Sequence, residues 1–336
     1  MRSPSVDIHC HYIPAALIEK IRAEGRAHSI ELVDENGDAR VAFAQRDSTQ
    51  SFPEGILDLE GRLRWMDERR IDIQVVSPWM DFSAYVLDPE DGAWLARSLN
   101  ELTAEAIASH PDRFRAMAAV PLQEPELAAG ELAHAVNDLG MRAVEIATSV
   151  RGRELDDEGL TPFWQSAEGI GVLVFIHPYG SAGSERLSRY FLANIVGNPA
   201  EETAAAAHLI YGGVLERHPR LKVCLTHGGG FLPYQIGRQD RGYASKPDLT
   251  AGRLTRAPSG FLGSFMYDTI THGTEALRFL VDRVGPDRVV LGSDYPFPMG
   301  DPDPVGSVAD AGFDADVEDA ILGRNASEVL GLSVAS

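Results

Sequence analysis

The sequence predicts an α/β fold, a slightly distorted (β/α)8 TIM barrel with a small polar insertion after the first strand. Eight short apolar, β-branched runs alternate with helical stretches, as in a parallel sheet covered by helices. Histidine and aspartate directly follow several of these runs, and the carboxyl ends of buried parallel strands meet at one edge. The chain has 336 residues, so we expect residues 1–336 to form a single barrel domain.

The expected strands and helices alternate along the whole chain. The strands are expected at residues 6–8, 71–77, 114–120, 143–146, 172–176, 222–226, 265–267 and 289–291. The helices are expected at residues 61–69, 92–110, 125–139, 162–169, 199–218, 233–243, 273–284 and 317–330. Several helices have proline in the first turn, where its missing N–H costs no hydrogen bond. Eight strands are the number that closes a barrel.

Two polar segments interrupt the alternation. Residues 27–53 read as a short hairpin with Asn36-Gly37 as its turn. Residues 179–198 form a longer insertion after the fifth strand. Because long loops at the carboxyl ends of barrel strands build the pocket, we expect both insertions to border it.

Composition excludes several classes of protein. Hydrophobic residues make up 44% and charged residues 24% of the chain, which is ordinary for a globular protein with a sizeable core. The formal net charge of −20 argues against nucleic acid and anionic membranes as partners, because both require basic patches. We find neither a membrane-spanning apolar run nor a signal peptide and therefore expect a cytoplasmic protein. Its two cysteines, Cys10 and Cys224, are expected to be reduced.

Two histidines close the first strand. His9 and His11 stand two residues apart, so on a strand both imidazoles project from the same face and can bind one ion. Taken alone, so short a pair is more often a chance pairing. Further candidates follow three later strands, at His177, His227 and Asp294. In a closed barrel all five side chains emerge at one rim, which favours a metal site.

The donor types indicate which ion and which chemistry. Imidazole and carboxylate ligands suit Zn²⁺, and Mn²⁺ or Fe²⁺ accepts the same donors. Three or four protein ligands that leave a position open for water are typical of a catalytic site. Such an ion lowers the pKa of its water towards about 7, and a base beside the water could remove the proton. One divalent ion, with zinc preferred, is therefore expected.

Four strings spread over the chain resemble a known family. They are Asp-Ile-His-Cys-His at 7–11, Phe-Ile-His-Pro at 175–178, Thr-His-Gly-Gly-Gly at 226–230 and Gly-Ser-Asp-Tyr-Pro-Phe-Pro at 292–298. Together they resemble the amidohydrolase superfamily, and within it the branch of the aminocarboxymuconate-semialdehyde decarboxylases. The resemblance covers essentially the whole chain. It implies a metal-dependent, non-oxidative decarboxylase that acts on an unsaturated or aromatic carboxylic acid.

The resemblance also implies a role for single residues. The implied ligands of the zinc ion are His9, His11, His177 and Asp294. His227 is then the acid/base beside the metal, and Asp294 takes part in catalysis as well as in metal binding. The substrate carbon that bears the carboxylate is protonated, and CO2 departs.

The fourth strand argues for a single ion. Binuclear members of the superfamily have a metal-bridging lysine there, whereas residues 143–147 read Ala-Val-Glu-Ile-Ala. Glu145 is a charged residue in a predicted core strand and needs a partner. We expect a buried ion pair with Arg142 or another basic residue, while roles as a second ligand or a base stay open.

Substrate recognition departs from the family pattern. In the resembling decarboxylases an arginine of the early insertion holds a substrate carboxylate, but residues 50–53 contain none and the nearest is Arg46. This departure leaves the exact acid open. A second family arginine, contributed across a dimer interface, is matched by Arg238, which implies a homodimer. The alternative for Arg238 is a solvated helix charge.

Aromatic and polar residues near the strand ends complete the expected pocket. Trp79, Tyr179 and Phe297 follow strands and are consistent with a flat, conjugated small-molecule ligand. Packing beneath loops is the alternative, and for Trp79 it is equally favoured. Asp268 and His272 follow the seventh strand, and either could orient a ligating imidazole.

Two other functions remain compatible with the same residues. A hydrolase or hydratase of a lactone, an amide or an unsaturated acid would use the same metal centre, because fold and metal do not fix the reaction. A non-catalytic, metal-stabilised binding protein is less favoured, because the predicted donors leave an open position with a base beside it. Release of CO2 separates the decarboxylase from the hydrolase.

Overall fold

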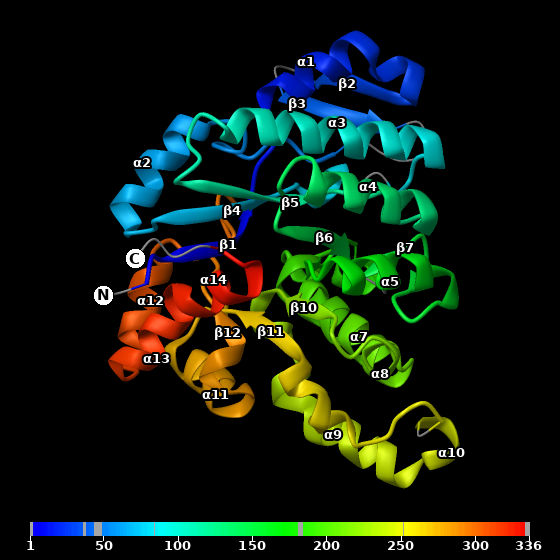
Figure 1. Cartoon of the computed structure of the whole chain (residues 1–336), viewed down its shortest axis with the longest axis vertical. Helices are drawn as coiled ribbons and strands as arrows, with labels where there is room; N and C mark the ends of the chain where they lie inside the picture. Colours follow the sequence, from blue (N-terminus) through cyan, green and yellow to red (C-terminus); the bar gives the residue numbers. More distant parts are fainter. Residues whose placement is uncertain are drawn as a thin grey trace.

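A computed structural model of the chain describes residues 3–35, 38–43, 49–83, 85–180, 184–250 and 252–332. Its centre is a parallel sheet of eight strands in the order β1-β4-β5-β6-β9-β10-β11-β12 (Figure 1). These strands are β1 (Val6–His11), β4 (Ile73–Ser77), β5 (Phe114–Ala118), β6 (Ala143–Ala147), β9 (Leu173–His177), β10 (Lys222–Leu225), β11 (Phe265–Asp268) and β12 (Val289–Val290). All eight predicted strands are confirmed, with small differences at their ends.

The two outer strands of this sheet meet, so that the sheet curls into a barrel. The N–H of Ile8 in β1 donates to the carbonyl of Leu291 at 3.0 Å, and the N–H of Ser293 donates to the carbonyl of His9 at 3.1 Å. A further parallel bridge joins Cys10 to Tyr295. The predicted TIM-barrel fold is therefore confirmed, with a nearly closed barrel.

Helices surround the barrel. They are α1 (Ala15–Glu24), α2 (Leu59–Arg69), α3 (Pro89–Ile107), α4 (Pro125–Asn137), α5 (Thr161–Ile170), α6 (Ser184–Leu187), α7 (Asn198–Tyr211), α8 (Val214–Arg217), α9 (Leu232–Ser245), α10 (Pro247–Thr250), α11 (Thr274–Val284), α12 (Pro304–Asp310), α13 (Ala315–Asp319) and α14 (Asn325–Leu330). The expected helix at 199–218 is divided into α7 and α8, because Gly213 has a φ of 71° and ends the helical path. The expected helix at 317–330 contains a π-helical turn, Ala320–Arg324, between α13 and α14.

The polar insertion after β1 is the predicted hairpin. Its strands β2 (Ile30–Glu35) and β3 (Asp38–Phe43) pair antiparallel. The expected turn Asn36-Gly37 lies outside the described residues, as does Arg46. The sequence did not predict α1, whose Leu17 packs in one apolar cluster with residues of the hairpin and of α3. Figure 1 shows α1, β2 and β3 stacked over α3 at one end of the molecule.

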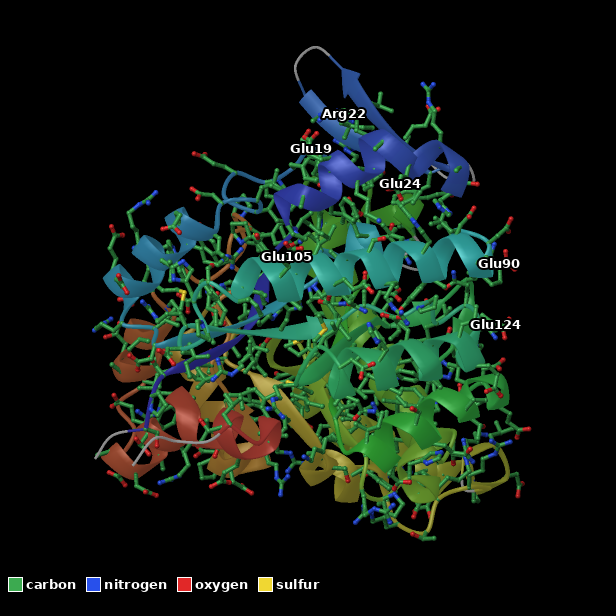
Figure 2. All side chains as sticks on the ribbon, turned by 45° about the horizontal axis from the view of Figure 1, so that its top comes forward. Glu19, Arg22, Glu24, Glu90, Glu105 and Glu124 are labelled. Carbon is green, nitrogen blue, oxygen red and sulfur yellow. The ribbon has the colours of Figure 1, made fainter. Side chains whose placement is uncertain are left out.

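Charged side chains cover the outer faces of the helices. Figure 2 shows Glu19, Arg22 and Glu24 extending outward from α1, and all three are exposed. Cys10 and Cys224 are instead buried and form no disulfide. Within the described residues, no helix combines the length and apolar character needed to cross a bilayer. The cytoplasmic location remains a prediction from the sequence.

A buried carboxylate, that of Asp7, links β1 to the residues that follow β12. Asp7 is fully buried and accepts hydrogen bonds from the N–H of Ser293 at 3.0 Å, its hydroxyl at 2.6 Å and the N–H of His9 at 3.1 Å. The side-chain amide of Gln74 donates to Asp7 at 2.7 Å and accepts from Arg62 at 3.1 Å. Arg62 is itself fully buried. These contacts link β1, β4, α2 and the residues that follow β12.

We expect Asp7→Ala to lower the free energy of unfolding by about 3 kcal/mol or more, because several buried donors lose their acceptor. Denaturant unfolding measures this loss. The exposed Asp112 provides the control, since Asp112→Ala should change stability by less than about 0.5 kcal/mol. Equal stability of the two variants would contradict the importance of this network.

Candidate metal centre and active site

The structure brings four donor residues together at the rim formed by the carboxyl ends of the strands. His9 and His11 belong to β1, His177 ends β9, and Asp294 follows β12. One ligand atom from each residue lies within 4.8 Å of the others. Nε2 of His9 is 3.4 Å, and Nε2 of His11 3.2 Å, from Oδ1 of Asp294. This cluster is the ligand set expected from the sequence.

An irregularity in β1 helps to place the two histidines. The register of β1 against β4 shifts by one residue between Asp7 and Cys10, as in a β-bulge. His9 and His11 both face the rim, where their ring centroids are 5.3 Å apart. Cys10 packs in the hydrophobic cluster on the other side of the strand. The two-residue spacing therefore predicted the shared face correctly.

Each histidine of the cluster is held through Nδ1, which leaves Nε2 pointing at the shared centre. Nδ1 of His9 is 2.6 Å from Oδ2 of Asp268. Nδ1 of His11 is 2.8 Å from the carbonyl of Pro78, and Nδ1 of His177 is 2.9 Å from the carbonyl of Pro178. Such contacts fix the tautomer and the ring orientation that a metal ligand needs.

The chemistry of the donor set fits a divalent cation. Nε2 of His9, Nε2 of His11 and Oδ1 of Asp294 are buried and have no hydrogen-bond partner among the described residues. Burial lowers the pKa of His9, but Asp268 and Asp294 outweigh it and raise the pKa to about 9. A cation that binds here replaces this proton, since ligating imidazoles are neutral. Three imidazoles and one carboxylate match a catalytic Zn²⁺ or Mn²⁺ site.

His227 lies beside this cluster, and Glu202 holds its ring through Nδ1. Its Nε2 is 3.9 Å from Oδ2 of Asp294, and its Nδ1 is 2.5 Å from Oε1 of Glu202. Glu202 is fully buried on α7 and also accepts a hydrogen bond from the hydroxyl of Thr226. Burial lowers the pKa of His227, but Glu202 and Asp294 outweigh it and hold the pKa well above its usual value. The imidazole can therefore keep a proton next to the metal ligands.

Sequence reasoning missed Glu202. It lies in a predicted helix, where an acidic residue is usually solvated. A signal was nevertheless present in the helical spacing, because Glu202 shares the i, i+3, i+4, i+7 face with apolar residues. The buried residues on that face are Glu202, Ala205, Ala206 and Leu209.

Of the two polar residues predicted to orient a ligand after the seventh strand, Asp268 does so. Besides contacting His9, its carboxylate accepts hydrogen bonds from the N–H groups of His227 at 3.0 Å and Gly228 at 2.9 Å. It therefore links a metal ligand to the loop that carries the acid/base candidate. His272 does not contact a donor residue and instead lines the cavity described next.

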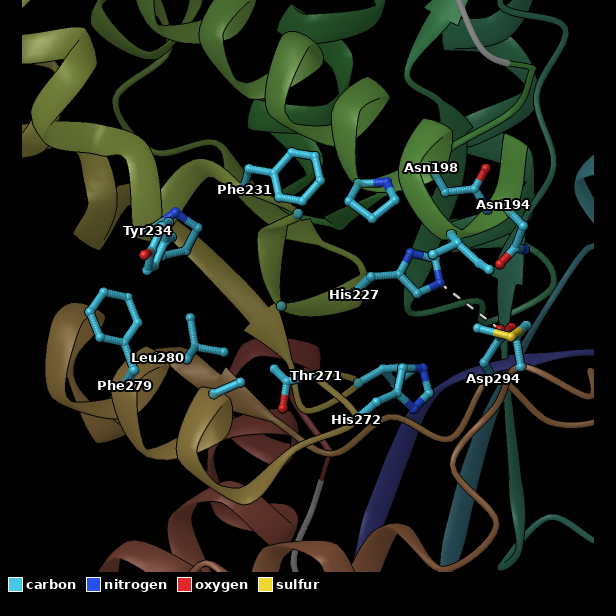
Figure 3. Close-up of a pocket in the computed structure, with 18 of the residues that line it drawn as sticks. Asn194, Asn198, His227, Phe231, Tyr234, Thr271, His272, Phe279, Leu280 and Asp294 are labelled. Carbon is cyan, nitrogen blue, oxygen red and sulfur yellow. Dashed lines mark ion pairs between the residues drawn. The ribbon is translucent and has the colours of Figure 1, made fainter. Parts of the chain in front are cut away.

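A cavity with two halves opens beside the cluster. The first half has a volume of about 560 Å³ and is bordered by the predicted residues Trp79, Tyr179, Phe297 and His177. The second half has a volume of about 550 Å³, and its lining includes Phe231, Ile270, His272, Phe279 and Leu280 (Figure 3). Both halves share Asn194, Asn198, His227, Asp294 and Met299. Each volume suits a small ligand.

Two predicted residues lie apart from this cavity. Arg238 is exposed on α9 and lines neither half. Glu145 is buried behind His11, where it accepts a hydrogen bond from the hydroxyl of Ser77 at 3.2 Å and lies 3.8 Å from Nδ1 of His11. Of the expected partners, Arg142 is wrong, because its side chain is exposed, and the basic residue beside Glu145 is His11 instead. Burial raises the pKa of Glu145 well above its usual value.

Comparisons with known proteins agree with this geometry. A family model described as amidohydrolase matches residues 6–332. The 2-amino-3-carboxymuconate-6-semialdehyde decarboxylase of Dictyostelium discoideum is 34% identical over 334 residues, which cover 98% of this chain and 92% of that protein.

Solved structures share the fold. The 5-carboxyvanillate decarboxylase of Sphingomonas paucimobilis has a TM-score of 0.84 at 23% identity, with 98% of this chain and 99% of that one covered. The dihydroxybenzoic acid decarboxylase of Polaromonas sp., solved with bound manganese and the inhibitor 2-nitroresorcinol, has a TM-score of 0.80 at 22% identity, covering 98% and 97%. The chain therefore belongs to the amidohydrolase family, in the branch that resembles the aminocarboxymuconate-semialdehyde decarboxylases.

Proposed function

We propose that this protein is a metal-dependent, non-oxidative decarboxylase of an aromatic or unsaturated carboxylic acid. The observation that carries this proposal is the placement of His227, which a buried carboxylate holds beside a four-donor metal cluster in a ligand-sized cavity. The named relatives are decarboxylases of such acids. Trp79 and Phe297 give the cavity the aromatic walls that suit a flat acid.

The chain supplies a proton at a defined atom. Because Nδ1 of His227 contacts Glu202, Nε2 is the nitrogen that faces Asp294 and the cavity. From Nε2 the proton passes to the substrate carbon that bears the carboxylate. A π bond of the conjugated acid supplies the electron pair of the new C–H bond. The bond between this carbon and the carboxylate then breaks, its electron pair re-forms the π bond, and CO2 leaves. A bound divalent ion stabilises negative charge on substrate oxygens during this reaction.

We propose zinc as the ion, held by His9, His11, His177 and Asp294. The donor set of three imidazoles and one carboxylate supports zinc. Manganese is the alternative, because the Polaromonas relative was solved with it and the same donors bind it. Iron(II) also accepts these donors.

We also propose a homodimer in which the partner subunit's Arg238 reaches the cavity. Arg238 is exposed on α9, which also bears the exposed Tyr234. Tyr234 lies 5.7 Å, between ring centroids, from the exposed Phe279 of α11. Contiguous exposed apolar surface of this kind is typical of an interface between proteins. A fully active monomer in sedimentation experiments would contradict the homodimer.

A panel of acids tests the activity. Metal-loaded protein is incubated with aromatic and unsaturated carboxylic acids, and CO2 release and ultraviolet absorbance are followed together. We expect one molecule of CO2 for each molecule of acid consumed, and no reaction after removal of the metal by a chelator. Consumption of a lactone, an amide or an unsaturated acid without CO2 would instead identify a hydrolase or a hydratase.

Variants separate the acid/base from the metal ligands. His227→Ala should retain the metal and lose about 100-fold to 10,000-fold in turnover, the usual contribution of a general acid or base. Asp294→Ala and His177→Ala should lose metal and activity together. Elemental analysis and steady-state kinetics measure both effects. Full activity of the first variant, or full metal content in the other two, would contradict these roles.

The pH dependence of kcat/KM tests Glu202 as a positioning residue. Because the carboxylate of Glu202 raises the pKa of His227, the neutral amide in Glu202→Gln should move the His227 limb of the kcat/KM profile to lower pH. We also expect kcat/KM to fall by about tenfold or more, with unchanged metal content. Glu201→Gln, one residue earlier on α7, is the matched control and should leave the profile unchanged. A profile that does not move in Glu202→Gln would contradict the positioning role.

A further inference from the structure

Three consecutive strand ends carry a residue with unusual backbone geometry. His227 follows β10 with a φ of 46°, His272 follows β11 with a φ of 53°, and Asp294 follows β12 with a φ of 59°. A positive φ is uncommon for residues other than glycine, and such residues gather at functional sites. Two of the three are the acid/base candidate and a metal ligand, whereas His272 has no role yet.

All three residues line the same half of the cavity. Figure 3 shows the imidazoles of His227 and His272 turned toward the end of the cavity where Asp294 lies. His272 stands in the short loop between β11 and α11, at the mouth of this half, and is exposed. Its side chain makes no hydrogen bond or ion pair with any other described residue. The strain at residue 272 is therefore not explained by a contact within the described part of the chain.

The lining of the cavity indicates what His272 can bind. Neither half has an arginine or a lysine among its described lining residues, and three lining residues are histidines: His177, His227 and His272. His177 belongs to the metal cluster, and His227 is held by Glu202 as acid/base. His272 is therefore the lining histidine whose ring nitrogens remain for the substrate. Ile270 and Leu280 line the same half and offer no competing hydrogen-bond donor from their side chains.

We propose that His272 is a substrate-binding residue whose imidazole donates a hydrogen bond to an anionic oxygen of the acid. The contact comes from the half of the cavity opposite Trp79 and Phe297, so that the acid is held between an aromatic wall and a ring N–H. The inference rests on the proposed decarboxylase function, because that function places an anionic substrate next to His227. His272 then helps to determine which substituted acids are accepted.

Substitutions at residue 272 test this role. Asparagine tolerates a left-handed backbone but does not reach as far as histidine, so His272→Asn should lower kcat/KM about tenfold to hundredfold, mainly through KM. The longer His272→Gln returns an N–H donor and should recover part of this loss. Metal content and thermal midpoint should stay unchanged in both variants. Arg151→Asn is the matched control, because Arg151 is exposed, has a φ of 52° and lines neither half of the cavity.

A binding measurement accompanies the kinetics. Calorimetry with 2-nitroresorcinol should show weaker binding to metal-loaded His272→Asn than to wild type, because a nitro group has the shape of a carboxylate and offers two oxygens as hydrogen-bond acceptors. Unchanged kcat/KM and unchanged affinity in His272→Asn, together with an active wild type, would refute the role of His272 and leave the proposed function standing. Loss of metal or of thermal stability in the variant would also overturn it, because His272 would then be structural. A wild type that neither releases CO2 nor binds 2-nitroresorcinol would refute the proposed function, and the inference with it.

Discussion

The site depends on one buried carboxylate placed among imidazoles. Oδ1 of Asp294 lies within 3.4 Å of Nε2 of both His9 and His11, and these atoms have no hydrogen-bond partner among the described residues. Burying polar atoms in this way is unfavourable unless a partner compensates them, and a cation does so for all of them at once. The backbone fixes the same arrangement, because the N–H of Asp294 donates to the carbonyl of His9 at 2.6 Å. The contacts between β1 and the residues after β12 therefore close the barrel and also bring the metal ligands together, although these segments are far apart in the sequence.

Two further carboxylates, Asp268 and Glu202, hold imidazole rings of the site through Nδ1. Asp268 contacts Nδ1 of His9 and accepts from the N–H groups of His227 and Gly228, so a metal ligand and the loop of the acid/base share one anchor. Glu202 instead holds the ring of His227 and sets which nitrogen faces the cavity. A change at Asp268 should disturb both metal and proton transfer, whereas a change at Glu202 should act on the proton alone. This separation makes the roles distinguishable by experiment.

The sequence predicted the parts of the site that follow from strand periodicity and from the motif strings. His9 and His11 share a face because they are two residues apart, and His177 and Asp294 meet them because parallel strands end at one rim. The role of Glu202 could not be found in the same way, since the helical spacing of α7 indicates a buried face but not that this face meets His227, which follows β10. Arg142 was wrong as a partner of Glu145 for a related reason: Arg142 precedes β6 and is exposed, whereas Glu145 is buried in β6 beside His11 of the distant strand β1. Local sequence patterns therefore could not predict which side chains of distant segments contact each other.

The identity of the acid depends on residues outside the metal cluster. The cluster provides a binding site for a metal, the proposed role of His227 is to supply a proton, and decarboxylases with this fold are named for differently substituted acids. Discrimination among such acids has to come from groups that contact the substituents, because the leaving carboxylate is common to all of them. Residues 50–53 contain no arginine, and the described lining of both halves contains neither arginine nor lysine. The hydrogen bond proposed for His272 selects polar oxygens, which both charged and uncharged substituents supply.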